Sequence, residues 1–453
     1  MKILIAGDGK VGAALTRQLS SEGYDLTLID NNPEVLANTV NQYDVMAVEG
    51  NCAAMDVLEE AGVKEADLLI AATSSDEVNM ICCLTAHAMN KKLHTIARIR
   101  TPEYANQLYL MRGIFALSMS VNPEKQAARE MLRLLQYPGF LHRETFAKGR
   151  VEIVELRIDE DSPLKNHPLS QLPEIVGCRV LVCTVVRAGV ASAPSGDFVL
   201  KAGDRIYVTA PTHNLATLLK NLKIIARPVK RVMLCGAGRI SYYLADLLLR
   251  AGMQVKIVEK EYAACRQISE LLPRAEVIQG DASRQATLEN EGLQDYDALV
   301  SLTGLDELNM VISMIGSSLK VPHIITKLGH MESTPILNEL PIGSIVYPKE
   351  LCSNTIVRYV RALKNQTGAA VAVHSIADGQ AEAVEFLVDK DTPCCGVPLK
   401  DLKLKNNVLI VCISHGENIE IPHGDSSYQE GDTLILVTSG DHIIYSLNDI
   451  FQI

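Results

Sequence analysis

The chain has 453 residues, which is too long for one ordinary hydrophobic core and predicts several domains. Hydrophobic residues make up 47% of it and charged residues 21%, so each domain has enough apolar material for a packed core. The formal net charge of −11 argues against nucleic acid or anionic lipid as a partner, because both need clustered Lys and Arg. Since no apolar stretch approaches the ~20 residues that span a bilayer, we expect no direct membrane insertion.

The first predicted elements are parallel strands joined by crossover helices. Short aliphatic runs alternate with helical patterns, as in a sheet whose two faces are both covered. Six strands of this kind predict a doubly wound Rossmann sheet. Asn122 and Pro123 then supply an N-cap and a proline at the first helical position, which predicts a helix over 122–136 that leads out of the domain. The six strands are expected at residues 2–6, 25–29, 45–48, 67–72, 95–99 and 115–119.

A glycine-rich loop follows the first strand and opens the first helix, at residues 7–12. In this position Gly7 permits a tight turn, Gly9 lets the backbone approach a pyrophosphate, and Gly12 lets the helix pack closely on the strand. Asp30 ends the second strand, where a carboxylate accepts hydrogen bonds from ribose hydroxyls and repels a 2′-phosphate. The loop therefore predicts a dinucleotide site that prefers NAD or a plain adenine nucleotide to NADP.

Further candidates lie where the other strands of this sheet end. Thr73 and Ser74 follow the fourth strand, and Arg98 ends the fifth. Other interpretations stay open: residues 74–77 also form a capping box that needs no ligand, and Lys10 and Arg98 could be ordinary solvated cations. The candidate cofactor-binding residues of the first half are Gly7, Asp8, Gly9, Lys10, Val11, Gly12, Asp30, Asn51, Cys52, Thr73, Ser74 and Arg98.

From Val151 onward the hydrophobic period shifts toward two, with β-rich runs at 180–186 and 205–209. This pattern predicts a second, smaller domain that combines strands and helices. It follows the Rossmann domain directly.

The second half of the chain repeats the first at an offset of 229 or 230 residues. Residues 2–11 recur as 231–240 and residues 73–80 recur as 303–310, which predicts a duplicated unit with its own site. Ser241 stands in place of the third glycine. Its Cβ adds bulk where helix meets strand, so we expect the second site to bind NAD(H) less tightly. The matched candidates are Gly236, Ala237, Gly238, Arg239, Ile240, Glu259, Asp281, Thr303 and Lys327.

The fold class that follows is α/β, with two doubly wound parallel Rossmann sheets that are each followed by a small α+β domain. We expect the Rossmann domains at residues 1–123 and 229–348. The small domains are expected at residues 141–226 and 368–453.

The tandem glycine loops, the acids that end each second strand, the turns at 50–51 and 280–281, and the Gly-Asp pairs of the small domains together resemble the TrkA family. Members of this family are NAD-binding peripheral subunits of bacterial Trk-type potassium uptake systems, built from two RCK (regulator of potassium conductance) modules. The resemblance covers essentially all 453 residues. It implies that the chain binds NAD(H), with ADP or ATP as further candidates, and forms a homo-oligomeric ring. It also implies docking on a membrane potassium-translocating subunit at the cytoplasmic face of the membrane.

The sequence favours a regulator over an enzyme, with no catalytic residue and no metal ligand. The eleven histidines and eleven cysteines show neither a paired nucleophile nor metal-ligand spacing. Each small domain spans only about 80 residues and offers no acid or base for hydride transfer. The apolar face of the helix over 122–136 leads us to expect an obligate oligomer that covers it. Two alternatives stay open, an NAD-dependent oxidoreductase with a duplicated fold and a nucleotide-binding scaffold for another transporter.

Overall fold

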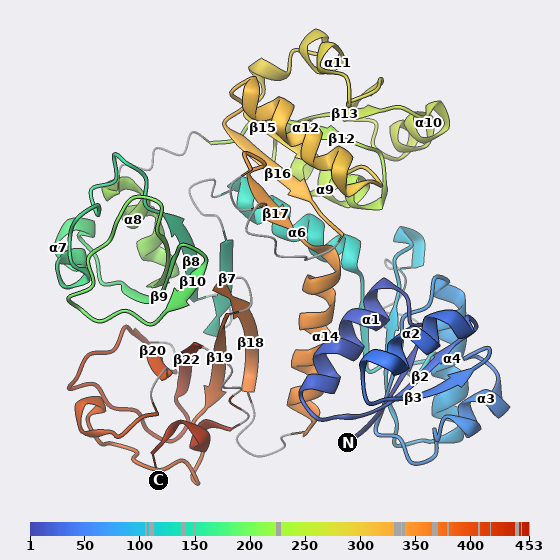
Figure 1. The fold of residues 1–453 in the computed structure, drawn as a ribbon, viewed down its shortest axis with the longest axis horizontal. Helices are drawn as coiled ribbons and strands as arrows, with labels where there is room; N and C mark the ends of the chain where they lie inside the picture. Colours follow the sequence, from blue (N-terminus) through green and yellow to red (C-terminus); the bar gives the residue numbers. More distant parts are fainter. Residues whose placement is uncertain are drawn as a thin grey trace.

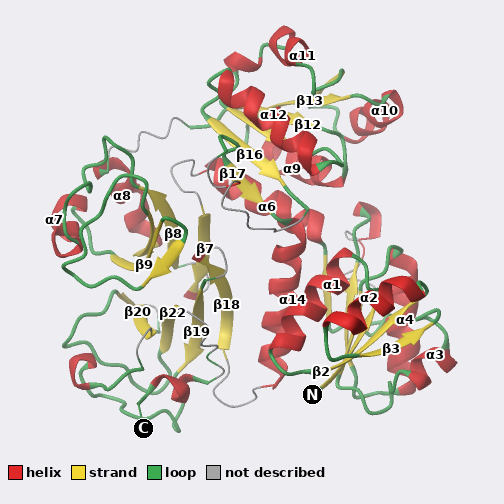
Figure 2. Cartoon of the chain, in the orientation of Figure 1, coloured by secondary structure: helices red, strands yellow, loops and turns green. Residues whose placement is uncertain are grey.

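The computed structural model describes most of the chain, and its elements form two α/β domains and two β-rich domains (Figures 1 and 2). The described residues are 1–104, 107, 113–136, 142–147, 150–222, 228–329, 337, 340–364, 370–377, 380–405, 408–416, 418–439, 444 and 446–452.

The first sheet has six parallel strands in the order β3-β2-β1-β4-β5-β6, which is the Rossmann arrangement predicted above. Its interior strands are buried aliphatic runs, because helices cover both faces. The strands are β1 (Lys2–Ala6), β2 (Asp25–Asp30), β3 (Met46–Glu49), β4 (Leu68–Ala71), β5 (His94–Arg98) and β6 (Met119–Val121), and the helices are α1 (Lys10–Ser21), α2 (Pro33–Gln42), α3 (Met55–Glu60) and α4 (Asp76–Met89).

The prediction of the sixth strand at residues 115–119 was wrong, because β6 begins only at Met119. Residues 113–116 form a turn in which Ala116 takes a left-handed conformation with φ 53°. Phe115 and Leu117 are apolar because they pack against the core from this connection. Hydrophobicity alone therefore does not separate the connection from the strand that follows it.

The second sheet repeats this order as β14-β13-β12-β15-β16-β17, again with parallel pairing. Its strands are β12 (Arg231–Cys235), β13 (Gln254–Glu259), β14 (Glu276–Gln279), β15 (Ala298–Ser301), β16 (His323–Lys327) and β17 (Ser344–Val346), and its helices are α9 (Arg239–Arg250), α10 (Tyr262–Leu271), α11 (Gln285–Asn290) and α12 (Asp306–Ser318).

Each small domain contains a five-stranded antiparallel sheet, in the orders β10-β9-β11-β8-β7 and β18-β19-β22-β20-β21. The predicted β-rich runs at 180–186 and 205–209 are β9 and β11. The elements are β7 (His142–Phe146), β8 (Val151–Arg157), α7 (Leu172–Val176), β9 (Leu181–Arg187), β10 (Val190–Ser192), β11 (Arg205–Pro211), α8 (Leu215–Asn221), β18 (Ala370–Ile376), β19 (Ala381–Leu387), β20 (Val408–His415), β21 (Asn418–Glu420) and β22 (Thr433–Ser439).

The two small sheets pack on each other through a shared apolar cluster that includes Phe146, Tyr207, Ile376 and Ile435. Glu385 adds a polar link, because its carboxylate accepts a hydrogen bond of 3.1 Å from the amide of Ala147. The small domains of the two halves therefore share one core.

Two long helices exchange places between the halves, as the centre of Figure 1 shows. Helix α6 (Pro123–Gln136) follows the first sheet but buries Ala127, Met131 and Leu135 against the second Rossmann domain. Helix α14 (Pro348–Lys364) follows the second sheet but buries Ile356 and Val360 against the first. Each half thus completes the core of the other.

This exchange corrects one expectation. The predicted helix over 122–136 is present, and Asn122 caps it by accepting a hydrogen bond of 2.8 Å from the amide of Lys125. Its apolar face, however, is covered by α9 of the same chain. The face therefore gives no reason to expect an oligomer.

A buried ion pair fastens α14 to the first Rossmann domain. Arg361 donates to both carboxylate oxygens of Glu22, at 3.1 Å and 2.5 Å, and their side chains are 4% and 1% exposed.

Within the part of the chain that the structure describes, no helix is long and apolar enough to cross a bilayer.

Candidate functional site

The two glycine loops lie at the carboxyl ends of β1 and β12 and lead directly into α1 and α9. Gly7 has φ +95°, and a Cβ there would come within 2.8 Å of the backbone of Thr73, so only glycine fits this turn. A Cβ at Gly9 would meet open space instead. Gly9 is also the N-cap residue of α1, and no side-chain cap occupies the first amides of the helix. Those amides are the groups that hold a phosphate at a helix N-terminus.

Asp30 and Glu259 stand beside these loops in equivalent geometry. Asp30 accepts hydrogen bonds from the amides of Asp8 at 2.7 Å and Asn32 at 2.9 Å. Glu259 accepts from the amides of Ala237 at 2.7 Å and Glu261 at 2.8 Å. Each carboxylate therefore fixes its glycine loop, and the remaining lone pairs of its oxygens can accept hydroxyl donors such as those of ribose.

The side chain of Asp8 contacts helix α2. Its carboxylate is buried and accepts a hydrogen bond of 2.5 Å from the hydroxyl of Thr39 in α2. Burial raises the pKa of Asp8, and the charge of Asp30 raises it further, while the bond from Thr39 opposes them. The second half has Ala237 at this position. The side chain of Asp8 thus ties the first loop to α2.

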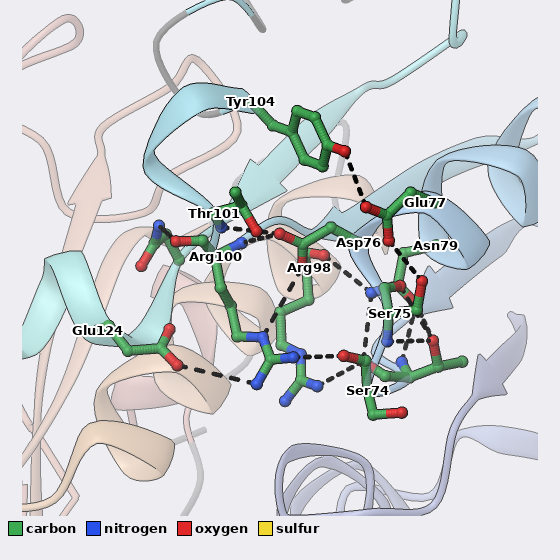
Figure 3. A network of polar contacts seen from close by, with 12 residues as sticks. Ser74, Ser75, Asp76, Glu77, Asn79, Arg98, Arg100, Thr101, Tyr104 and Glu124 are labelled. Atoms are coloured by element: carbon green, nitrogen blue, oxygen red, sulfur yellow. Dashed lines mark hydrogen bonds and ion pairs between the residues drawn. The ribbon is translucent and has the colours of Figure 1, made fainter. Parts of the chain in front are cut away.

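A buried asparagine holds each of the loops after β4 and β15, and neither asparagine is among the residues predicted from the sequence. Asn79 accepts hydrogen bonds from the amide and the hydroxyl of Thr73, at 2.8 Å and 2.7 Å, and donates to the carbonyl of Arg98 at 2.8 Å (Figure 3). Asn309 makes the same contacts with Thr303 and Lys327 in the second half. The available signal was the recurrence of this asparagine in both halves.

Two of the four cations among the predicted cofactor-binding residues, Arg98 and Lys327, contact the same loops. The Arg98 guanidinium donates to the carbonyl oxygen of Thr73, and the Lys327 ammonium donates to that of Thr303. Burial lowers the pKa of Arg98, and the charge of Arg100 lowers it further. Each cation therefore lies at the carboxyl edge of its sheet, next to the loop that follows the neighbouring strand.

The loop after β4 is also joined to the loop after β5. Asp76 is buried and accepts hydrogen bonds from the amides of Arg100 at 2.8 Å and Thr101 at 2.7 Å. Arg100 in turn donates to the carbonyl of Ser74 (Figure 3). The capping residue of α4 is Ser75, which accepts from the amide of Val78, so the predicted capping box beginning at Ser74 was wrong by one residue.

This network reaches the other half of the chain. The hydroxyl of Tyr243 in α9 donates to the carbonyl of Arg100 at 2.9 Å, and Asn122 donates to the hydroxyl of Tyr243 at 3.1 Å.

Burial lowers the pKa of Lys327, and the positive charge of Lys10 lowers it further, while Asp306 opposes them. The charge of Lys10 in the first loop thus acts on Lys327 in the second half.

The turns after β3 and β14 complete the two edges. Asn51 accepts a hydrogen bond of 3.1 Å from the amide of Ala53. Asp281 accepts from the amide and hydroxyl of Ser283, at 3.0 Å and 2.6 Å, and the hydroxyl bond lowers the pKa of Asp281. Cys52 is buried, so its side chain belongs to the core and only the backbone of this residue remains for a ligand.

Ser241 is accommodated by a hydrogen bond from its hydroxyl to the carbonyl of Gly236, at 2.6 Å. At the matching position, a Cβ on Gly12 would approach the carbonyl oxygen of Gly7 to 2.0 Å. The amide of Gly236 still donates to Val258 at 2.8 Å, as the amide of Gly7 does to the matching strand. The second loop thus keeps its shape with altered contacts, and the unequal affinity of the two sites stays a prediction.

Comparison with known proteins resolves the family. The TrkA-N domain model matches residues 3–117 and 232–348, and the TrkA-C domain model matches residues 153–223 and 383–449. The chain belongs to the TrkA family. It is 30% identical to the Trk system potassium uptake protein TrkA of Halomonas elongata over 462 residues, covering all of this chain and 99% of that relative. It is also 30% identical to a TrkA homolog of Archaeoglobus fulgidus, with both chains covered in full.

Solved structures share the fold of this TrkA-family chain. The GsuK channel superposes with a TM-score of 0.64 at 19% identity, over 97% of this chain and 76% of the channel chain. A structure of the GsuK channel bound to NAD gives a TM-score of 0.62 over the same shares.

Proposed function

We propose that the chain is a nucleotide-sensing regulatory subunit that binds NAD(H) at the carboxyl edges of its two Rossmann sheets. The observation that carries this proposal is the duplicated pair of glycine loops, in which Gly9 and Gly238 face open space at an uncapped helix N-terminus. An acid stands beside each loop, at Asp30 and Glu259. The residues given above for the two halves remain the proposed binding set, and the four residue ranges given above remain the proposed domains.

ADP or ATP is proposed as a second ligand class at the same edges. An adenine nucleotide needs the same phosphate-binding amides and the same ribose acceptor as NAD. GsuK, one of the fold neighbours, has been solved bound to NAD and also bound to ADP. We propose that these ligands are bound and not consumed, so that the protein is not an enzyme. Its response would be a shift between arrangements of its domains.

We propose that the partner is a membrane potassium-translocating subunit of the Trk type, whose gating follows nucleotide occupancy. On this proposal the chain is cytoplasmic and peripheral, attached to the membrane only through that partner. Support comes from the full-length similarity to proteins named for Trk potassium uptake. The net charge of −11 gives no independent attraction to anionic lipid.

Assembly into a homo-oligomeric ring is proposed on different grounds from the covered face of α6. Helix α4 exposes Ile81 and Leu84, and α12 exposes Val311 and Met314 at the matching offset of 230 residues. A second copy would cover these apolar pairs. Light scattering should then return a mass that is a multiple of 49.4 kDa, whereas a monomer at micromolar concentration would contradict the ring.

The test of the function combines binding with turnover. Purified protein should leave NADH unchanged in the presence of hydroxy and keto acids. The immobilised chain should capture a potassium-translocating protein from detergent-solubilised membranes. Steady oxidation of NADH above ~1 per second, an ordinary enzyme rate, would establish an oxidoreductase instead. Capture of a different transporter would contradict the proposed partner but not the proposed nucleotide sensing.

A further inference from the structure

A cavity lies at the amino ends of the strands in the second Rossmann sheet, on the edge opposite the glycine loop. Arg231 begins β12, Gln254 begins β13 and Glu276 begins β14, and all three residues line the cavity. Leu249 near the end of α9 and Met253 in the turn after it add apolar side chains. The cavity has a volume of about 450 Å³, which lies within the usual range of small-molecule sites.

One guanidinium group is held in place against an aromatic ring of this cavity. The guanidinium carbon of Arg231 lies 4.7 Å from the centre of the Tyr296 ring, and the ring is buried beneath it. One nitrogen of Arg231 also donates to the carbonyl of Asp295 at 3.1 Å. Because a guanidinium has five N–H donors, Arg231 keeps others for an acceptor that enters the cavity.

A second guanidinium group, that of Arg274, lines the same cavity and is exposed. Within the part of the chain that the structure describes, no hydrogen bond or ion pair engages it. Glu276 is the one acid among the described lining residues, and the ammonium of Lys256 lies 3.2 Å from its carboxylate. The cavity therefore offers two cations, while its acid already has a cationic partner.

The first half of the chain lacks this combination of residues. The two sheets pair in the same register, so the positions can be matched directly. The matching residues are Asp25 for Gln254, Asp44 for Arg274 and Ala66 for Tyr296. A requirement of the Rossmann fold itself would apply to both sheets. The cationic and aromatic lining is therefore a feature of the second half alone.

We propose that this cavity binds a small organic anion, in which a carboxylate or phosphate group is attached to an apolar or aromatic part. Both arginines would donate to the anionic group, because planar guanidinium donors match the oxygens of carboxylates and phosphates. Leu249 and Met253 would cover the apolar part. The nucleotide sites lie at the other edge of the sheets, so this site goes beyond the proposed function and does not depend on it.

Calorimetric titration of the full chain with two probes tests the site, with NADH in excess so that the glycine loops are occupied. Phenyl phosphate joins a phosphate to an aromatic ring, and phenylacetate presents a carboxylate on a similar ring. Arg274→Asp places the acid of the first half in the cavity and should lower the affinity at least about tenfold. Because Arg274 is exposed and unpaired within the described residues, this variant should fold normally.

Arg266→Asp is the matched control, because it makes the same change of charge outside the cavity. Arg266 lies on α10, is 73% exposed and pairs with Glu270, so its replacement should leave the affinity unchanged. Failure of both probes to bind, or an equal loss in the two variants, would overturn the proposal. Displacement of the probe by NADH would place it in the glycine loops and would overturn the proposal as well. If the chain binds no NADH, the proposed function fails, and the comparison of the two variants still decides this site.

Discussion

The buried pair between Glu22 and Arg361 should be the most costly single polar contact between the two halves to break. Replacing Arg361 by Met leaves the carboxylate of Glu22, 1% exposed, without its cation. Removing one partner of a buried ion pair costs about 3–5 kcal/mol, because the other charge stays buried and uncompensated. Glu382 lies 3.4 Å from the same guanidinium, so Arg361→Met leaves a second carboxylate without this partner. We therefore expect a loss toward the upper end of that range.

The assay is urea unfolding followed by circular dichroism, with a double-mutant cycle and an exposed control pair. The Glu22→Gln/Arg361→Met double variant should recover the part of the loss that comes from Glu22, because residue 22 is then no longer charged, while the part that comes from Glu382 remains. Arg17 of α1 and Glu350 of α14 form an ion pair of 2.9 Å in the same interface, but Arg17 is 53% exposed, so Arg17→Ala should cost less than about 1 kcal/mol. Equal losses in Arg361→Met and Arg17→Ala would refute the claim that α14 is fastened by the buried pair.

Three further predictions follow from the site and the first small domain. Asn79→Ala removes the side-chain amide that holds Thr73 in the loop after β4 and bonds to the carbonyl of Arg98. Calorimetry should therefore show weaker NADH binding at the first site, and unchanged affinity would mean that this loop does not contact the ligand. Gly12→Ser places a Cβ 2.0 Å from a carbonyl oxygen and should weaken the first site, whereas Ser241→Gly should tighten the second by up to about tenfold; opposite signs would remove the basis for unequal sites. Burial is the largest influence on the pKa of Asp204 and raises it, but the hydrogen bonds from Arg187 and from the amide of Lys201, together with the charges of both residues, outweigh burial and lower the pKa. The stability that Asp204 contributes is therefore present above its ordinary pKa and is lost as the pH falls through the lowered value. Arg187→Ala should therefore flatten the acid end of the stability profile, and an unaltered profile would exclude this pair as its source.

The sequence was sufficient to predict the Rossmann sheets because their strands are continuous aliphatic runs, and parallel strands covered on both faces require such runs. The duplication supported this prediction, since every strand of the first sheet has a matched strand in the second. The positions of the glycine loops and of the acids that flank them followed from the same order. These features are local in sequence, so a pattern of a few residues fixes them.

Long-range packing could not be predicted in the same way. The apolar period of residues 123–136 showed which face of α6 is buried, but it could not show that α9 of the same chain covers it. The roles of Asn79 and Tyr243 depend on loops brought together only by the folded sheet. Cys52 looked like a member of the ligand turn, yet its side chain is buried in the core of the first Rossmann domain.

Calorimetric titration of the reduced full chain with NADH tests whether the paired glycine loops bind the nucleotide. We expect two binding phases, the tighter at the first site. Asp30→Ala removes the acceptor beside the first loop and should abolish the tighter phase, while Glu259→Ala should retain it and lose the weaker one. Absence of NADH binding by the unaltered protein, or two phases that both survive these substitutions, would contradict the assignment of nucleotide binding to the paired glycine loops.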